Sequence, residues 1–96
     1  MTAKIELYTS PMCSGCRAVK RALDAENVPY EEIDVTTLSL ADRGPVLTDL
    51  RMSYPGSASS GVLEAPIARN PATGGAVPAS VLCSGDPVNL ILEILD

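Results

Sequence analysis

The stretch YTSPMCSGCRAVKRAL, residues 8–23, holds two of the three cysteines of the chain, Cys13 and Cys16. Upstream, residues 4–9 alternate apolar and polar side chains as a short strand does, and Ser10-Pro11 ends the alternation. Downstream, residues 14–27 contain good helix formers, no proline and apolar side chains at helical spacing. The two cysteines therefore lie where a strand is expected to give way to a helix.

Two cysteines at this spacing have three interpretations: a redox pair, half of a metal site, or two inert thiols. A structural metal site takes four ligands, whereas the chain has no histidine and one further cysteine, Cys83. The redox interpretation is therefore favoured. Cys83 is expected to be a small, half-buried core residue, because a free cysteine packs as a small hydrophobic side chain.

The composition is typical of one small domain. The chain has 96 residues, of which 46% are hydrophobic, and this is close to the common size of a single domain. We therefore expect one domain over residues 1–96. Seven basic residues against 12 acidic ones give a net charge of −5, which repels nucleic-acid phosphates and anionic membranes. Neither nucleic acid nor a membrane is an expected partner.

Cysteine usage and the N-terminal residues indicate a compartment. Three cysteines without regular spacing do not make the disulfide framework of a secreted protein. Residues 1–6 lack a basic segment leading into an apolar run, and no stretch approaches the roughly 20 apolar residues of a membrane span. A cytoplasmic location, where thiols stay reduced, is therefore expected.

Beyond the first helix, strands and helices continue to alternate. Residues 30–35, YEEIDV, are predicted as a second strand, and its connection through a helix predicts parallel pairing with the first. A second helix is expected to end near Met52, and two starts remain open. It begins at Ser39 with Pro45 inside it, or after Gly44 with that proline at the first helical position.

The next part of the chain predicts a loop and a hairpin. Residues 53–61 are small, polar and rich in turn formers, as in an exposed loop. Residues 62–70 are predicted as a third strand and residues 70–75 as a turn. A fourth strand is predicted over residues 76–82, and Pro78 confines it to a sheet edge.

The chain is expected to close with a helix. Asp86 is a good N-cap residue, and Pro87 suits the first helical position. Apolar residues then recur at helical spacing, at Val88, Ile91, Leu92 and Leu95. The predicted order of elements is strand, helix, strand, helix, strand, strand, helix.

The surroundings of Cys13 are suited to disulfide exchange. The reaction requires a thiolate, whereas a free cysteine, with a pKa of about 8.5, is mostly protonated at neutral pH. Unpaired backbone N–H groups and the dipole at the start of the predicted helix stabilise negative charge there. The charged residues of the stretch are all positive: Arg17, Lys20 and Arg21. Cys16 lies one helical turn further on and can reach back, so Cys13 is the predicted nucleophile and Cys16 the predicted resolving thiol.

Three short motifs and the order of elements resemble a known group of proteins. YTSPMCSGC, residues 8–16, resembles the YTKPxCxxC opening of glutaredoxins and NrdH-type redoxins. EAPI, residues 64–67, resembles their segment with a cis-proline, and CSGD, residues 83–86, resembles their glycine-containing turn. The resemblance covers nearly the whole chain. It implies an α/β thioredoxin-like fold of glutaredoxin size, β-α-β-α-β-β-α, with a four-stranded mixed sheet and flanking helices.

The resemblance also implies a substrate site around the two thiols. Pro66 is expected to be a cis-proline that faces the CxxC motif and leaves backbone groups free to pair with an extended substrate chain. The residues expected to contact substrate are Pro11, Ser14, Gly15, Arg17, Ala65, Pro66, Ser84, Gly85 and Asp86. No metal ligand and no bound cofactor are expected. Electrons are expected from thioredoxin reductase and NADPH or from glutathione.

The function implied is a monomeric thiol–disulfide oxidoreductase that donates electrons to protein disulfides such as that of ribonucleotide reductase. The NrdH-type interpretation is slightly favoured, because Ser10, Ser14 and Gly15 replace the lysine and the aromatic residue that help glutaredoxins to bind glutathione. Cys83 and Asp86, however, replace the tryptophan and phenylalanine of NrdH-type redoxins. A glutathione-dependent glutaredoxin is the alternative. Further alternatives are a redox-sensing regulator similar to Spx and an iron–sulfur or metal-binding module.

Overall fold

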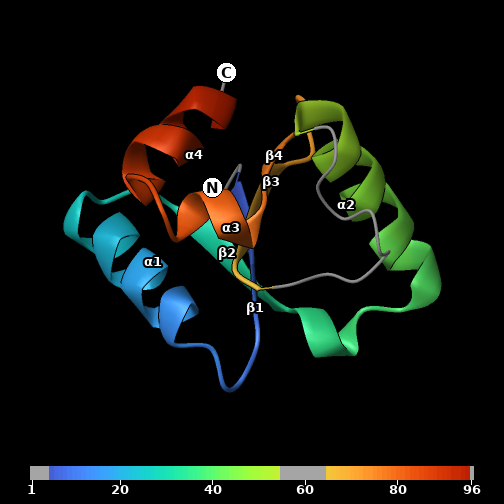
Figure 1. The fold of residues 1–96 in the computed structure, drawn as a ribbon, viewed down its shortest axis with the longest axis horizontal. Helices are drawn as coiled ribbons and strands as arrows, with labels where there is room; N and C mark the ends of the chain where they lie inside the picture. Colours follow the sequence, from blue (N-terminus) through green and yellow to red (C-terminus); the bar gives the residue numbers. More distant parts are fainter. Residues whose placement is uncertain (1–4, 55–64, 96) are drawn as a thin grey trace.

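The computed structural model describes residues 5–54 and 65–95. It shows a four-stranded sheet with helices on both faces (Figure 1). The elements are β1 (Ile5–Thr9), α1 (Ser14–Ala25), β2 (Tyr30–Asp34), the 3₁₀ helix η1 (Val35–Thr37), α2 (Leu40–Ser53), β3 (Ile67–Asn70), β4 (Gly75–Val77), α3 (Ala79–Leu82) and α4 (Pro87–Leu95). The predicted order of strands and main helices is confirmed, and η1 and α3 are additions to it.

The sheet is mixed, and its strand order is β2-β1-β3-β4. β1 pairs in parallel with β2, with Ile5 opposite Tyr30 and Thr9 opposite Asp34. It pairs antiparallel with β3, which pairs antiparallel with β4. Because β1 and β2 run parallel, their carboxyl ends lie at the same end of the sheet. The chain passes from that end into α1. The expected thioredoxin-like arrangement is confirmed.

Alternation along the strands divides the core between the two faces of the sheet. Figure 1 shows α1 and α4 on one side of the sheet and α2 on the other. The first cluster, on the side of α1, α3 and α4, consists of Ile5, Leu7, Val19, Leu23, Val28, Ala68, Val77, Leu82 and Ile91. The second cluster, on the side of α2, consists of Tyr8, Val35, Val46, Leu50, Ile67 and Ala76. β1, an inner strand, therefore has buried side chains on both faces of the sheet, and this fixes its register.

The end of α1 is set by a residue in the left-handed region. Asn27 has a φ of 55°, a conformation that asparagine tolerates better than most residues. The N–H of Val28 then bonds to the carbonyl of Leu23 at 2.9 Å, which is the long-range bond of a Schellman motif. The helix consequently ends at Ala25, two residues before the expected limit.

The start of α2, which the sequence left open, is at Leu40. The hydroxyl of Ser39 accepts the N–H of Asp42 at 3.2 Å and so caps the helix. Pro45 therefore lies inside the helix, where its nitrogen cannot donate the usual backbone bond. Buried side chains further along hold α2 against the sheet, namely Val46 and Leu50.

The fourth strand is shorter than predicted, so the prediction of a strand over 76–82 is wrong. β4 ends at Val77, and the residues after Pro78 form α3. Proline has no N–H with which to continue the ladder, and its carbonyl instead accepts the N–H groups of Val81 and Leu82 at 3.1 and 3.0 Å. The position of this strand at the sheet edge is confirmed.

The third strand also differs from its predicted limits. β3 begins at Ile67, whereas residues 62–64 and most of the predicted loop, residues 55–61, lie outside the described residues. Ser53, the first residue of that predicted loop, is the last residue of α2. The predicted turn between the last two strands is confirmed, with Gly74 at a φ of 78°.

A partly buried arginine ties α2 to the sheet. Arg69 of β3 donates from Nε to Asp49 of α2 at 2.7 Å and from Nη1 to Glu6 of β1 at 3.1 Å. Tyr8 donates its hydroxyl to Glu6 at 2.6 Å, and burial together with this bond raises the pKa of Tyr8 to about 12. Because the Arg69 guanidinium has two carboxylate partners, its charge is compensated where α2 meets the sheet.

A buried asparagine joins the β3–β4 turn to the end of α4. The Nδ2 of Asn70 donates to the carbonyls of Ile94 and Leu95 at 2.8 and 3.1 Å, and its Oδ1 accepts the N–H of Ala72 at 3.0 Å. The side chain is fully buried. Because the last carbonyls of a helix have no partner within the helix, this amide satisfies groups that would otherwise lack one.

Replacement of Asn70 by alanine is expected to lower the free energy of unfolding by about 2–4 kcal/mol, because several backbone groups lose their partner. Urea unfolding followed by circular dichroism measures the change. Asn89→Ala is the matched control, since Asn89 is exposed on α4 and bonds to Asp86 at 3.0 Å. The control is expected to cost less than about 0.5 kcal/mol, and equal losses in both variants would contradict the role given to Asn70.

Candidate functional site

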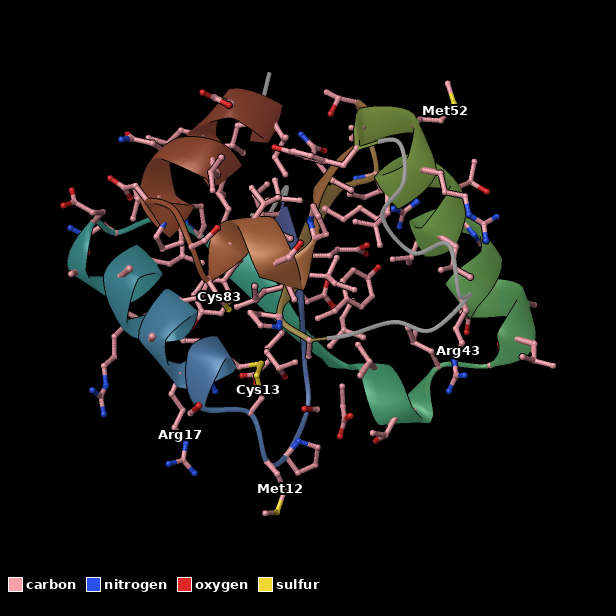
Figure 2. The ribbon with its side chains drawn as sticks, viewed as in Figure 1. Met12, Cys13, Arg17, Arg43, Met52 and Cys83 are labelled. Carbon is pink, nitrogen blue, oxygen red and sulfur yellow. A yellow bond between two sulfur atoms is a disulfide. The ribbon has the colours of Figure 1, made fainter. Side chains whose placement is uncertain are left out.

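The two cysteines of the CxxC motif form a disulfide at the start of α1. Their Cα atoms are 5.3 Å apart, within the usual range for a disulfide. Cys13 is partly exposed, whereas Cys16 is only 2% exposed. Figure 2 shows Cys13 next to the loop between β1 and α1, at one end of the molecule. A partner that approaches this end therefore reaches Cys13 before Cys16.

Cys13 is also the N-cap residue of α1. Its Sγ accepts the N–H of Cys16 at 3.0 Å, and the first turn of the helix holds no acidic residue. After reduction, the same N–H group and the positive end of the helix dipole favour a thiolate at Cys13. Cys16 lies inside the first turn and is buried. These positions favour Cys13 over Cys16 as the attacking thiol.

The peptide bond between Ala65 and Pro66 is cis, as the resemblance implied. The carbonyl oxygen of Ala65 lies 3.6 Å from Cys13 Sγ. Because a disulfide sulfur carries no hydrogen, this is a van der Waals contact. Pro66 is buried, and a Cβ added at Gly15 would lie 3.6 Å from its Cδ. The structure thus gathers three of the predicted contact residues around the disulfide.

Cys83 is exposed, so its predicted place in the core is wrong. The prediction relied on the tendency of a free cysteine to pack as a small hydrophobic side chain, whereas Cys83 is the C-cap of the short helix α3. Its Sγ faces the motif, because a Cβ added at Gly15 would lie 2.9 Å from it. The missing side chain at position 15 therefore allows the third thiol to approach the CxxC backbone.

A groove of about 310 Å³ follows this contact between α1 and the segment from α3 to α4. Its lining is mostly apolar, with Gly15, Ala18, Val19, Ala22, Leu82, Cys83, Gly85 and Pro87. Ser84 and Asp86 bond within their own segment: Ser84 Oγ donates to the carbonyl of Ser80 at 2.7 Å, and Asp86 Oδ1 accepts the N–H of Val88 at 3.1 Å. Of the predicted turn residues, Gly85 shares a groove with Gly15, and substrate contact by the other two stays a prediction.

A cavity of about 480 Å³ lies beside the disulfide, near the carboxyl ends of β1 and β2. Its lining combines the thiol pair with charged and polar groups: Thr9, Ser10, Pro11, Cys13, Cys16, Arg17, Lys20, Glu32 and Asp34. Two of the predicted contact residues, Pro11 and Arg17, belong to it. Ser14 instead lines a smaller depression, which Cys13 also lines.

Thr9, Glu32 and Lys20 form a hydrogen-bonded chain in this cavity. Thr9 Oγ1 and Lys20 Nζ both donate to Glu32 Oε2, at 2.9 and 3.1 Å. The Thr9 bond, followed by the Lys20 bond, lowers the pKa of Glu32 below its usual range. Sequence reasoning missed Thr9 and Glu32. The available signal was the parallel pairing of the first two strands, which brings polar residues near their carboxyl ends together.

The three basic residues of α1 have different surroundings. Lys20 is paired with Glu32, as described. Arg17 lines both hollows that include Cys13, whereas Arg21 lines neither of them. Arg21 lines a depression further along the helix with Asp24 and others. Of the three, Arg17 is therefore the one placed to act on a charge at the motif and its rim.

Residues 5–54 and 65–95 hold no group of three or more side chains arranged to bind a metal ion. None of the helices in these ranges has the length and hydropathy required to cross a membrane.

The sequence and the fold were compared with those of known proteins. The glutaredoxin family model matches residues 5–45, from β1 into α2, and this range includes the CxxC motif. Over these residues the chain is similar to glutaredoxins, and we refer to it as a redoxin because of its cysteine pair. Its cysteine pair at disulfide distance identifies the chemistry as thiol–disulfide exchange. No curated protein matches the chain.

Two solved structures resemble the redoxin over nearly its whole length. The crystal structure of a mutant of the thioredoxin-like protein BC3987 is 28% identical, has a TM-score of 0.57 and covers 97% of this chain and 99% of its own. A second crystal structure of BC3987 is 26% identical, has a TM-score of 0.53 and covers 95% of this chain and 99% of its own. At this coverage the similarity includes most of the chain beyond residue 45.

In the reduced redoxin, Cys13 is expected to react with iodoacetamide faster than Cys16, with a half-maximal rate below about pH 8.5, because the helix start stabilises its thiolate. Alkylation over a pH series, with mass spectrometry to locate the adduct, measures this. Arg17→Gln is expected to slow the reaction at pH 7 about twofold, since exposed charges contribute modestly. Arg21→Gln is the matched control and is expected to leave the rate unchanged. A midpoint at or above the value of a free cysteine would refute the activation by the helix start.

Proposed function

We propose that this redoxin is a disulfide reductase that passes two electrons from Cys13 and Cys16 to a protein disulfide, with ribonucleotide reductase as a candidate acceptor. The observation that carries the proposal is the unequal placement of the two cysteines. One is partly exposed and accepts a backbone N–H at the start of α1, and the other is buried within disulfide reach of it. This arrangement suits one thiol to attack and the other to release the product.

The reaction consists of two exchanges. The Cys13 thiolate attacks one sulfur of the substrate disulfide, a mixed disulfide forms, and the second substrate sulfur leaves as a thiolate. Cys16 then attacks the Cys13 sulfur, which forms the intramolecular disulfide and releases the first substrate sulfur. The substrate disulfide has become two thiols, and the two thiols of the redoxin have become a disulfide. An external reductant restores the dithiol.

The segment at Pro66 is proposed to hold the substrate backbone. The carbonyl of Ala65 lies beside the Cys13 sulfur, so an extended chain that pairs with this segment brings its own cysteine to the nucleophile. Gly15 presents no side chain at this point. Pro11, Ser14, Arg17 and the turn at residues 84–86 complete the proposed contact surface.

Cys13→Ser is expected to abolish reduction of a disulfide-bonded peptide, because no attacking thiol remains. Cys16→Ser is expected to accumulate a mixed disulfide between Cys13 and the peptide, because the resolving step is lost. Mass spectrometry after an acid quench distinguishes the two outcomes. Cys83→Ser removes the third thiol and is expected to complete both exchanges. Full turnover by both variants of the CxxC pair would rule out the proposed mechanism.

The preferred reductant is expected to be thioredoxin reductase with NADPH. Positions 10, 14 and 15 lack the lysine and the aromatic side chain with which glutaredoxins hold glutathione, and Lys20 is engaged by Glu32. A charge-assisted hydrogen bond contributes about 1.5–3 kcal/mol, so loss of one such contact weakens binding roughly tenfold or more. We therefore expect at least about tenfold faster NADPH oxidation with thioredoxin reductase than with glutathione and its reductase.

The same assay separates the other functions. Robust activity with glutathione and none with thioredoxin reductase would favour a glutaredoxin, whereas no turnover with either would favour a redox-sensing regulator or a metal-binding module. Supply of electrons from NADPH implies a reducing compartment, and we propose the cytoplasm as the place of action.

A further inference from the structure

Charge is distributed unevenly on the rim of the CxxC motif. Arg17 is exposed, and within the described ranges its guanidinium makes no hydrogen bond or ion pair. Lys20, about one turn further along α1, is paired with Glu32 at 3.1 Å. The positive charge of Arg17 is therefore available to a partner, whereas that of Lys20 is largely offset.

Arg17 and Cys13 line a depression of about 210 Å³ together with Pro11, Met12 and Ser14. The side chain of Met12 is 96% exposed. Figure 2 shows Met12 and Arg17 pointing outwards from the same end of the molecule, near the disulfide. A partner that covers this depression meets one cation and one flexible apolar side chain, and it does so next to the reactive sulfur.

The carboxylates near the motif lie outside this depression. Glu32 and Asp34 line the larger cavity, which Arg17 also lines, and they do not line the depression. Asp34 is engaged by Thr36, whose hydroxyl and N–H both donate to Oδ1, and these bonds lower the pKa of Asp34. No carboxylate therefore competes for Arg17 within the depression itself.

We propose that the substrate of this redoxin is a protein segment in which an acidic side chain flanks the disulfide cysteine and pairs with Arg17, while an apolar neighbour packs on Met12. The proposal rests on the disulfide-reductase function and names its substrate class. A guanidinium binds a carboxylate through two parallel hydrogen bonds, which fixes the orientation of the segment as well as attracting it. The exchange is the one given above, and it requires no further reactant.

The overall negative charge of the redoxin does not attract an acidic segment, so selection has to occur at short range. A net charge of −5 repels an acidic segment at long range. At physiological salt the Debye length is about 8 Å, so a charge at the rim acts on a docked segment while distant charges are screened. Acidic substrates are consequently selected by contact with Arg17 and not by the field of the whole molecule.

The test is single-turnover oxidation of the reduced redoxin by two synthetic peptides that share one intramolecular disulfide and differ only in flanking residues, glutamate or lysine. No reductase is present, so the choice of reductant does not enter. Acid quenching and chromatography give the rate constant for each peptide. The ratio of the two rates cancels any change in thiolate reactivity that a variant causes.

The glutamate peptide is expected to react about tenfold faster than the lysine peptide at about 0.15 M salt, with a smaller ratio at about 0.5 M. Arg17→Glu is expected to reverse the preference, and Arg17→Lys, which keeps the charge but loses the paired hydrogen bonds, to retain only part of it. Arg21→Glu is the matched control, since it also exchanges one positive for one negative charge and leaves the ratio within about twofold.

Equal rates for the two peptides, or a preference that survives Arg17→Glu, would overturn the proposed substrate class and leave the reductase function intact. An equal effect of Arg21→Glu would overturn it as well, because overall charge would then suffice. Failure of both peptides to oxidise the CxxC pair would instead refute the reductase function itself.

Discussion

A single hydrogen bond, from the N–H of Cys16 to the Sγ of Cys13, connects the fold of this redoxin with its chemistry. A helix begins with backbone donors that lack partners, and they are usually satisfied by a side-chain oxygen. Here a sulfur takes that role, so the atom that caps α1 is also the proposed attacking atom. The position of Cys13 Sγ is thereby tied to the helix axis, and through β1 to the centre of the sheet.

Polar contacts at the ends of the elements hold this frame together. Arg69 connects β1, β3 and α2, while Asn70 connects the β3–β4 turn with the end of α4. Both are supplied by one strand and serve elements distant in the sequence. The groups around the cysteines, near the carboxyl ends of β1 and β2, are partly exposed. This part of the molecule is therefore suited to receive a partner.

Features determined by nearby residues were predictable from the sequence. The start of α1, the cap at Asp86, the turn before Gly75 and the place of the CxxC motif follow from local propensities, and the structure confirms them. The course of the chain after Pro78 was not predictable in the same way, because an apolar run after a proline suits either a strand or a short helix.

The contents of the site were only partly visible in the sequence. Cys13 and Cys16 were predictable from their spacing, and the cis-proline was predictable from the resemblance. Thr9 and Glu32 lie 23 positions apart and meet only through the parallel register of two strands, which short-range patterns do not specify. Likewise, the approach of Cys83 to the motif depends on how α3 packs, and no local pattern encodes that.

Because Gly15 and Cys83 are in close contact, the side chains at positions 15 and 83 compete for the same space. A side chain at position 15 would meet the sulfur at position 83, and a bulkier residue at position 83 would press on the backbone inside the motif. Substitutions at the two sites are therefore expected to depend on each other: an aromatic residue inside the motif requires a smaller or differently directed side chain after α3. The residues tolerated between the two cysteines of the CxxC motif therefore depend on the residue at position 83, almost 70 positions away.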